Sequence, residues 1–162
     1  MAGPYTPMEL MICCAARLLE DGRTVAVGTG APCAAAMLAQ RTSAPNLVIV
    51  FEAGGVAPQL PTMPISVGDS RTFYRGLMAT SMADIMETCQ RGLIDYTFLG
   101  GAQIDAYGNL NSTMIGTDYA RPQVRLPGSG GANACLSPTP DAAWRVGGHG
   151  SRDIEQWRLG AV

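Results

Sequence analysis

The stretch Leu47-Val48-Ile49-Val50-Phe51-Glu52-Ala53-Gly54-Gly55 decides the fold that we predict for this chain. Five apolar residues, three of them β-branched, lead into one carboxylate and a small flexible turn. A short apolar run that ends at Gly-Gly is typical of a buried strand in a parallel sheet. Open α/β sheets place their ligand crevice at the carboxyl ends of such strands. Glu52 is therefore either an idle, solvated carboxylate or a functional group, and its neighbours decide which.

A glycine turn and a helix precede this strand. Residues 24–27 predict a short buried strand, a turn from Gly28 follows, and Pro32 suits the first turn of a helix that reaches about Arg41. The order strand, turn, helix, strand is a βαβ unit with a right-handed crossover. The chain therefore predicts an α/β fold: an open, mostly parallel sheet with flanking helices and glycine-rich loops at the carboxyl ends of the strands.

Further elements flank this unit on both sides. A capping box of Thr6 and Glu9 begins a helix that we expect to run through Leu19 and to end at Gly22. A second box begins a helix at Ser81, and residues 94–99 predict another strand. The prolines within residues 56–69 predict an ordered loop across the carboxyl edge of the sheet.

Composition limits the classes of function. The 162 residues suit one domain, carry a net charge of −2 and are 47% apolar. This balance gives no basic footprint for nucleic acid or an acidic membrane surface, and we expect another chain to cover part of the exterior. All 11 basic residues are arginine, which excludes a lysine Schiff base.

The cysteines and the single histidine do not form a zinc motif, since no CxxC pair exists. The odd number of cysteines, five, and the absence of a signal peptide pattern predict a cytoplasmic protein. No apolar run approaches the roughly 18 residues that span a bilayer. We expect four of the cysteines to be buried, reduced thiols: Cys13, Cys14, Cys33 and Cys89.

Three features share one edge of the predicted sheet: the turn after Gly28, Glu52, and the glycine loop at residues 128–131. A carboxylate between glycine turns has room beside it for an acyl group and can act as a nucleophile. Backbone N–H groups of the turns can form an oxyanion hole, in which one donor contributes about 3 kcal/mol. An alternative is a dinucleotide site, because Gly28 and Gly30 partly match that fingerprint, although Cys33 replaces its third glycine.

Six motifs in a fixed order make the chain resemble the β subunit of family I CoA-transferases, of the glutaconate CoA-transferase type. The resemblance covers about residues 6–133, and the motifs are specific as a set. They lie at residues 27–32, 52–54, 66–69, 100–105, 107–116 and 128–133.

The resemblance implies roles for particular residues. Glu52 matches the residue that forms a glutamyl-CoA thioester in this family, so coenzyme A would be a substrate, with no permanently bound cofactor and no metal. It also implies an α-subunit partner, with acyl-CoA and a carboxylic acid as substrates. Side-chain amides of Gln103, Asn109 and Asn111 would support the site. The loops that would form the oxyanion hole and bind CoA contain Gly28, Thr29, Gly30, Ala31, Gly128, Ser129, Gly130 and Gly131.

The last part of the chain departs from the family pattern. We divide the chain into a CoA-transferase-like α/β domain at residues 1–133 and an irregular tail without a strand at residues 134–162. Because family β subunits continue differently, we hypothesise a frame change or a truncation near residue 133. Alternatives to CoA transfer are a CoA-thioester hydrolase or ring-cleaving relative of the same fold, and a nucleotide-binding or structural subunit. The acyl group is not predicted.

Overall fold

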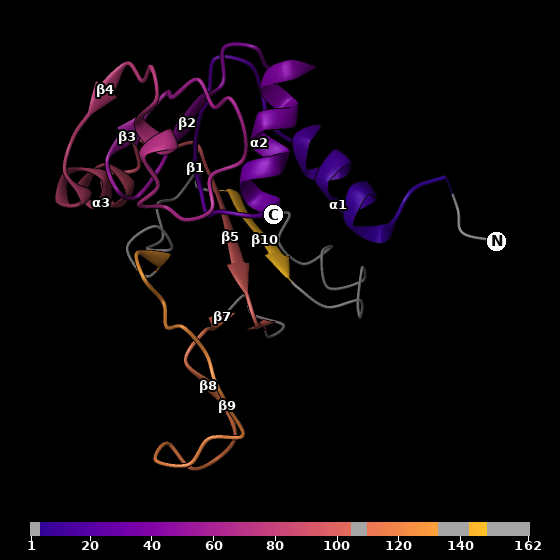
Figure 1. The fold of residues 1–162 in the computed structure, drawn as a ribbon, viewed down its shortest axis with the longest axis vertical. Helices are drawn as coiled ribbons and strands as arrows, with labels where there is room; N and C mark the ends of the chain where they lie inside the picture. The colour runs from indigo at the N-terminus through magenta and orange to yellow at the C-terminus, as the bar shows by residue number, and fades with distance from the viewer. Residues whose placement is uncertain (1–3, 105–109, 133–142, 149–162) are drawn as a thin grey trace.

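A six-stranded sheet forms the centre of the molecule in the computed structural model, which describes residues 4–104, 110–132 and 143–148 (Figure 1). The strand order is β10-β5-β1-β2-β3-β4. The first four of these pair in parallel, and β3 and β4 are antiparallel. The predicted α/β fold with a mostly parallel sheet is confirmed. The strands are β1 (Thr24–Val27), β2 (Val48–Val50), β3 (Gly55–Val56), β4 (Met78–Ala79), β5 (Tyr96–Gly101) and β10 (Ala143–Gly148).

The predicted strand–helix–strand unit lies at the middle of this sheet. Helix α2 (Ala31–Arg41) connects β1 to β2, and Ala26 pairs with Val50 in parallel register. Gly30 precedes the helix with a φ of +85°, a conformation that favours glycine, and Pro32 lies in its first turn. The turn and the helix thus begin where the sequence predicts.

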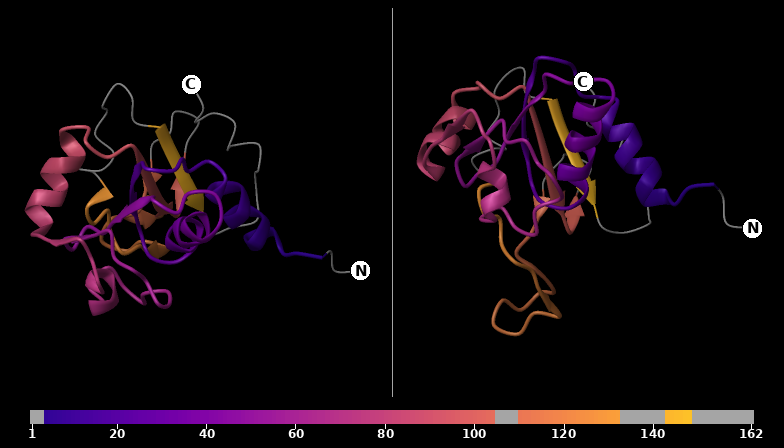
Figure 2. Two further views of the ribbon diagram at one scale, coloured as in Figure 1. Left: turned by 90° about the horizontal axis from the view of Figure 1, so that it is seen from above. Right: turned by 45° about the horizontal axis from the view of Figure 1, so that its top comes forward.

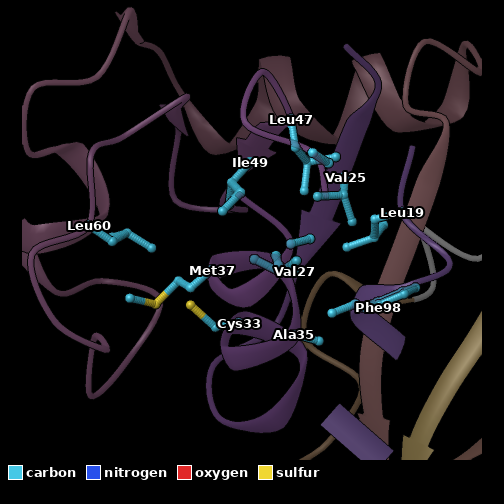
Figure 3. Packing of buried hydrophobic residues seen from close by; sticks show 14 of the residues in the cluster. Leu19, Val25, Val27, Cys33, Ala35, Met37, Leu47, Ile49, Leu60 and Phe98 are labelled. Carbon is cyan, nitrogen blue, oxygen red and sulfur yellow. The ribbon is translucent and has the colours of Figure 1, made fainter. Parts of the chain in front are cut away.

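The two faces of the sheet pack against different helices. Val25 and Val27 of β1 point into a core that includes α2 residues such as Cys33 (Figure 3). Ala26 packs on the opposite side, in a cluster with Ile85 of helix α3 (Met82–Gln90). Figure 2 shows α3 on one side of the sheet and α1 and α2 on the other. The alternation of side chains along β1 therefore produces three layers.

Helix α1 (Pro7–Ala16) begins as predicted but ends early. The Thr6–Glu9 capping box is present. The expected continuation through Leu19 is wrong, because the Leu19 amide donates to Ala16 in a tighter turn that brings this leucine into the core, where it is 3% exposed. Gly22, with a φ of +75°, turns the chain toward β1 and does not cap the helix.

The expected burial of four cysteines is half wrong. Cys33 and Cys89 are buried, but Cys13 and Cys14 are exposed. Helix α1 packs against the core through Ile12, Ala15 and Ala16, so its cysteines lie on the outer surface of an outer layer.

Residues 57–69, within the segment expected to be an ordered loop, contain no helix and no strand, but short elements that the sequence did not predict lie on both sides of them. β3 and β4 extend the sheet past β2, and η1 (Ser70–Phe73) lies between them. Asp69 and Arg71 fix this turn: the Arg71 side chain donates to both Asp69 oxygens and to the Met63 carbonyl. These bonds hold the pKa of the Asp69 carboxyl below its usual range, since they favour its charged form. Strands of two residues carry no periodic pattern that a sequence could show.

Two small hairpins follow β5 and extend away from the sheet (Figure 1). β6 (Gln103–Ile104) pairs with β7 (Leu110–Asn111), and β8 (Met114–Ile115) pairs with β9 (Val124–Arg125). The expected absence of a strand after residue 133 is wrong, because β10 pairs in parallel with β5 over six residues. Within the described ranges, no helix is long and apolar enough to cross a bilayer, and no cluster of residues suits a metal ion.

Candidate active site

Glu52 lies in the tight turn that connects β2 to β3, at the carboxyl end of β2. The Gly54 amide donates to the Phe51 carbonyl at 2.9 Å, and the Phe51 amide donates to the Gly55 carbonyl at 2.9 Å. Glu52 is therefore the first of the two central residues of a β-turn. Its side chain is half-buried. The predicted strand end is thus a hairpin turn, which points a carboxylate out of the edge of the sheet.

Close packing on both sides fixes this turn. A Cβ on Gly54 would lie 1.9 Å from the Thr80 carbonyl oxygen, and one on Gly55 would lie 1.9 Å from the Thr72 carbonyl oxygen. Gly54 also has a φ of +112°, and its carbonyl accepts from the Thr80 amide at 2.9 Å. Since only glycine fits at both positions, the backbone beside Glu52 has little freedom.

The glycine loop near residue 130 reaches the Glu52 carboxylate. The Gly131 amide donates to Glu52 Oε2 at 3.3 Å, across 79 positions of sequence. A Cβ on Gly131 would lie 2.7 Å from the same oxygen, and one on Gly130 would lie 4.0 Å from it. The absence of a side chain at residue 131 therefore allows the backbone to approach the carboxylate.

Two backbone hydrogen bonds connect or shape this loop within the part of the chain that the structure describes. The Gly128 amide donates to the Ser112 carbonyl at 2.8 Å, and the Ala132 amide donates to the Ser129 carbonyl at 2.9 Å. Gly128 and Ser129 are exposed. The bond to Ser112 ties the loop to the base of the β8–β9 hairpin.

The turn after β1 lies level with Glu52 on the neighbouring strand. Because Ala26 pairs with Val50, Gly28 and Glu52 leave the sheet at the same height. The Gly28 amide already donates to the Phe98 carbonyl at 3.0 Å. Within the described residues, the amides of Thr29, Gly30 and Ala31 make no hydrogen bond, and none joins this turn to Glu52.

The predicted supporting amides bond to one another. Asn111 Nδ2 donates to Gln103 Oε1 and to the Met114 carbonyl, both at 2.7 Å, and Asn111 Oδ1 accepts from the Thr113 amide. These bonds connect the two hairpins. Asn109 lies outside the described residues, as do Cys135 and His149.

Met86 of α3 is a side chain at this site that sequence reasoning missed. A Cβ on Gly131 would lie 2.8 Å from Met86 Cε, on the side where it would also meet Glu52. Met86 follows Ile85 and precedes Cys89 in the apolar stripe of α3, so its sequence signal is that of an ordinary core residue.

Cys33 occupies the position where a dinucleotide-binding fingerprint requires its third glycine. Its side chain is 0% exposed, in the core beneath α2. Burial raises the pKa of the Cys33 thiol to about 11, because the charged form is disfavoured there, so the thiol stays protonated near neutral pH. The packing at this position argues against the dinucleotide alternative.

Comparisons with known proteins give one consistent result. A family model described as "Coenzyme A transferase" matches residues 8–144. The chain is 42% identical over 129 residues to the B subunit of the 3-oxoadipate CoA-transferase of Pseudomonas knackmussii, covering 79% of this chain and 49% of the relative. It is 40% identical over 134 residues to the B subunit of the glutaconate CoA-transferase of Acidaminococcus fermentans, covering 80% and 50%. The chain thus spans about half the length of these relatives.

Solved structures agree with the sequence matches. The glutaconate CoA-transferase of Acidaminococcus fermentans superposes with a TM-score of 0.75 and 37% identity, covering 81% of this chain and 52% of that one. The decarboxylase AibA/AibB superposes with a TM-score of 0.70 and 32% identity, covering 80% and 54%.

Proposed function

This chain belongs to the coenzyme A transferase family, and we propose that it is the β subunit of an enzyme that moves CoA from an acyl-CoA to a carboxylic acid, with Glu52 as the nucleophile. The resemblance that the motifs indicate is confirmed at the level of the family. The observation that carries the proposed mechanism is the Gly131 amide on the Glu52 carboxylate, at the tip of a rigid turn.

The reaction begins with the Glu52 carboxylate attacking the thioester carbonyl carbon. The carbon–sulfur bond breaks, CoA leaves as a thiolate, and an acyl-glutamyl anhydride remains. The thiolate then attacks the Glu52 carbonyl carbon. The bond from this carbon to the bridging oxygen of the anhydride breaks, and the original acyl group leaves as a carboxylate with the electron pair. The product is a glutamyl-CoA thioester, and an acceptor carboxylate takes the CoA by the reverse sequence.

Backbone amides at the site suit the charge that develops in these steps. When the thiolate attacks the Glu52 carbonyl carbon, negative charge collects on the remaining glutamyl oxygen. The Gly131 amide already donates to Oε2, and it would stabilise this oxyanion by about 3 kcal/mol. The unbonded amides of Thr29, Gly30 and Ala31, at the same height on the neighbouring strand, are candidates for the oxygen of the acyl group.

The proposed enzyme contains a second, α-type subunit. Both curated relatives are named as B subunits, and each is about twice the length of the matched region. Large apolar side chains on this chain also lie open to solvent: Ile65 is 85% exposed and Leu77 is 84% exposed. Uncovered apolar surface of this kind is typical of a protein–protein contact. A cytoplasmic location stays a prediction.

A second candidate function uses the same site for a reaction other than transfer. The AibA/AibB structure, at 32% identity, is named as a decarboxylase, so the fold carries more than one chemistry. In a CoA-thioester hydrolase, water would resolve the same glutamyl intermediate. A transferase would move CoA to an added carboxylic acid, whereas a hydrolase would release free CoA, so the product formed distinguishes the two functions.

Chemical trapping tests the proposed nucleophile. The full chain with its α-type partner is incubated with acyl-CoA and then with borohydride or hydroxylamine, and the peptide that contains Glu52 is examined by mass spectrometry. We expect a modified Glu52 that disappears in Glu52→Gln. Glu87→Gln, which removes a carboxylate from the exposed side of α3, is the matched control and should leave trapping unchanged. An unmodified Glu52 in an active complex would overturn the assignment.

A further inference from the structure

Helix α3 contacts both halves of the candidate site. Just before the helix and its N-cap, Thr80 donates its amide to the carbonyl of Gly54 at 2.9 Å, and Gly54 lies two residues after Glu52. The capping box of Ser81 and Asp84 then fixes the first turn of the helix. One turn further on, Met86 meets Gly131, the residue that donates to the Glu52 carboxylate. One rigid element thus spans the nucleophile turn and the loop that carries the donor.

The contact between Met86 and Gly131 is unusually close to the carboxylate. A Cβ on Gly131 would lie 2.8 Å from Met86 Cε, 3.0 Å from Met86 Sδ and 2.7 Å from Glu52 Oε2. The thioether and the carboxylate therefore border the same small space beside the Gly131 Cα. The thioether thus lies beside the loop, on the side to which a Cβ of residue 131 would point.

The rest of the Met86 side chain is held by the core. It is half-buried and packs against the cluster that contains Val50 of β2 and Ile85 of α3. Val50 is two residues before Glu52. The core therefore positions the thioether relative to the strand that carries the nucleophile. Among the described residues, the glycine loop is tied to the rest of the chain by the Gly128 bond to Ser112 and the Gly131 bond to Glu52.

We propose that Met86 is a positioning residue, whose thioether holds the Gly131 amide in hydrogen-bonding geometry with the Glu52 carboxylate. The proposal rests on the proposed function, in which Glu52 is the nucleophile and Gly131 the donor. Met86 has no chemical role in the proposed reaction. It acts through the backbone of Gly131. If Met86 served only to pack the core, the hydrogen bond from the Gly131 amide to Glu52 would not depend on the Met86 side chain.

The ionisation of Glu52, observed at Gly131, tests this proposal. In the full chain labelled with ¹⁵N-glycine, the Gly131 signal is identified by its loss in Gly131→Ala. We expect its amide proton shift to follow the titration of Glu52 in the wild type and not to titrate in Glu52→Gln. In Met86→Ala the titration amplitude should fall by at least about twofold, because hydrogen bonds weaken steeply as their geometry worsens.

Two further variants separate positioning from packing. Met86→Leu conserves the volume and should keep the wild-type amplitude. Met82→Ala removes the same side chain one turn earlier, where it is 53% exposed, and should have no effect. If the other glycine signals show that Met86→Ala does not fold, Met86→Val takes its place as the shortened variant, with the same expected loss.

The possible outcomes either support or overturn the proposal. Three results would each overturn it. The wild-type Gly131 signal could fail to change with the ionisation of Glu52, the shortened Met86 variant could keep the full amplitude, or Met82→Ala could lose as much amplitude as Met86→Ala. In an active complex, Met86→Ala should lower kcat by about tenfold or more and change KM by less than about twofold. Failure of Glu52 trapping would instead overturn the proposed function and leave the Gly131 titration result standing, so the two failures are distinguishable.

Discussion

The two halves of the candidate site are built in different ways. The turn that carries Glu52 follows a buried strand and is enclosed by the backbones of Thr72 and Thr80. The loop that carries Gly131 follows an exposed two-residue strand, and its nearest anchor is a single hydrogen bond to Ser112. The nucleophile is thus fixed by the core of the sheet, whereas the donor is placed by a peripheral hairpin and one methionine. A site of this kind tolerates change on the donor side without loss of the fold.

The largest effect should come from Gly54→Ala, which alters the turn that carries Glu52, the rigid half of the site. Its new Cβ would lie 1.9 Å from the Thr80 carbonyl oxygen, in a backbone with a φ of +112°. Because the Thr80 oxygen belongs to the backbone and cannot rotate away, the clash forces the turn apart, and we expect the free energy of unfolding to fall by about 3 kcal/mol or more.

Chemical denaturation measures this loss, with Gly22→Ala as the control. Gly22 also has a positive φ, +75°, but nothing lies within 4 Å of its added Cβ. That substitution should cost only about 1–2 kcal/mol, the strain of a left-handed residue. Equal losses in the two variants would mean that the packing around the Glu52 turn adds nothing.

Gly131→Ala should have the second largest effect, on activity and not on the fold. The three atoms nearest to the new Cβ belong to the ends of two side chains, Glu52 and Met86, and not to the backbone, so stability should change by less than about 1 kcal/mol. The displaced carboxylate loses its donor, and the rate of Glu52 trapping should fall by about 10²-fold.

A matched glycine provides the control for this variant. Gly68→Ala adds a Cβ whose nearest neighbour is Ser66 Oγ at 3.8 Å, an ordinary van der Waals contact that involves neither Glu52 nor Gly131. It should leave trapping unchanged. A Gly131→Ala enzyme that traps at the wild-type rate would show that the donor half of the site is not needed.

The difference between the two halves also explains what the sequence could predict. The β1–α2–β2 unit was predictable because its apolar runs are bounded by Gly28, Pro32 and Gly54, and the capping boxes at Thr6 and Ser81 marked two helix starts. The short strands β3 and β4 were not predictable, since two residues give no period. Exposure of Cys13 depends on which layer α1 occupies, which is a tertiary fact.

Contacts within the site show the same division. The sequence indicated that Glu52 and the glycine loop share an edge, because parallel strands end on one side of a sheet. It did not indicate which amide meets the carboxylate, nor that Met86 borders it, since those contacts join segments 79 and 45 positions apart across three layers. Role assignments for the loop residues stay predictions.

Asp69→Asn probes the loop that encloses the rigid half. The Asp69 carboxylate accepts bonds from Arg71 and from the Ile65 amide, and these hold its pKa below the usual range. The stabilisation is therefore complete above the unfolded-state pKa of about 4 and is lost as the pH falls toward the lower folded-state value.

Stability measured against pH checks this sign. The wild type should lose stability below about pH 4 more steeply than Asp69→Asn, and the two curves should converge in acid. Glu87→Gln, in a surface pair with Arg91, should follow the wild-type curve. Parallel curves for wild type and Asp69→Asn would contradict the role given to the carboxylate.

Asn111→Ala should have the smallest effect and should be confined to the peripheral half. The variant loses the hydrogen bonds from Asn111 Nδ2 to Gln103 Oε1 and to the Met114 carbonyl, and the bond that Asn111 Oδ1 accepts from the Thr113 amide. We expect the loss of all three bonds to cost about 1 kcal/mol. Hydrogen exchange of the Leu126 and Gly128 amides, which bond across the base of the same hairpin, should accelerate about fivefold. The Gly28 amide, bonded to Phe98 in the central sheet, should exchange at its wild-type rate. If exchange of the Gly28 amide accelerates equally, the hairpin and the sheet open together. The donor half is then as much a part of the rigid core as the turn that carries Glu52.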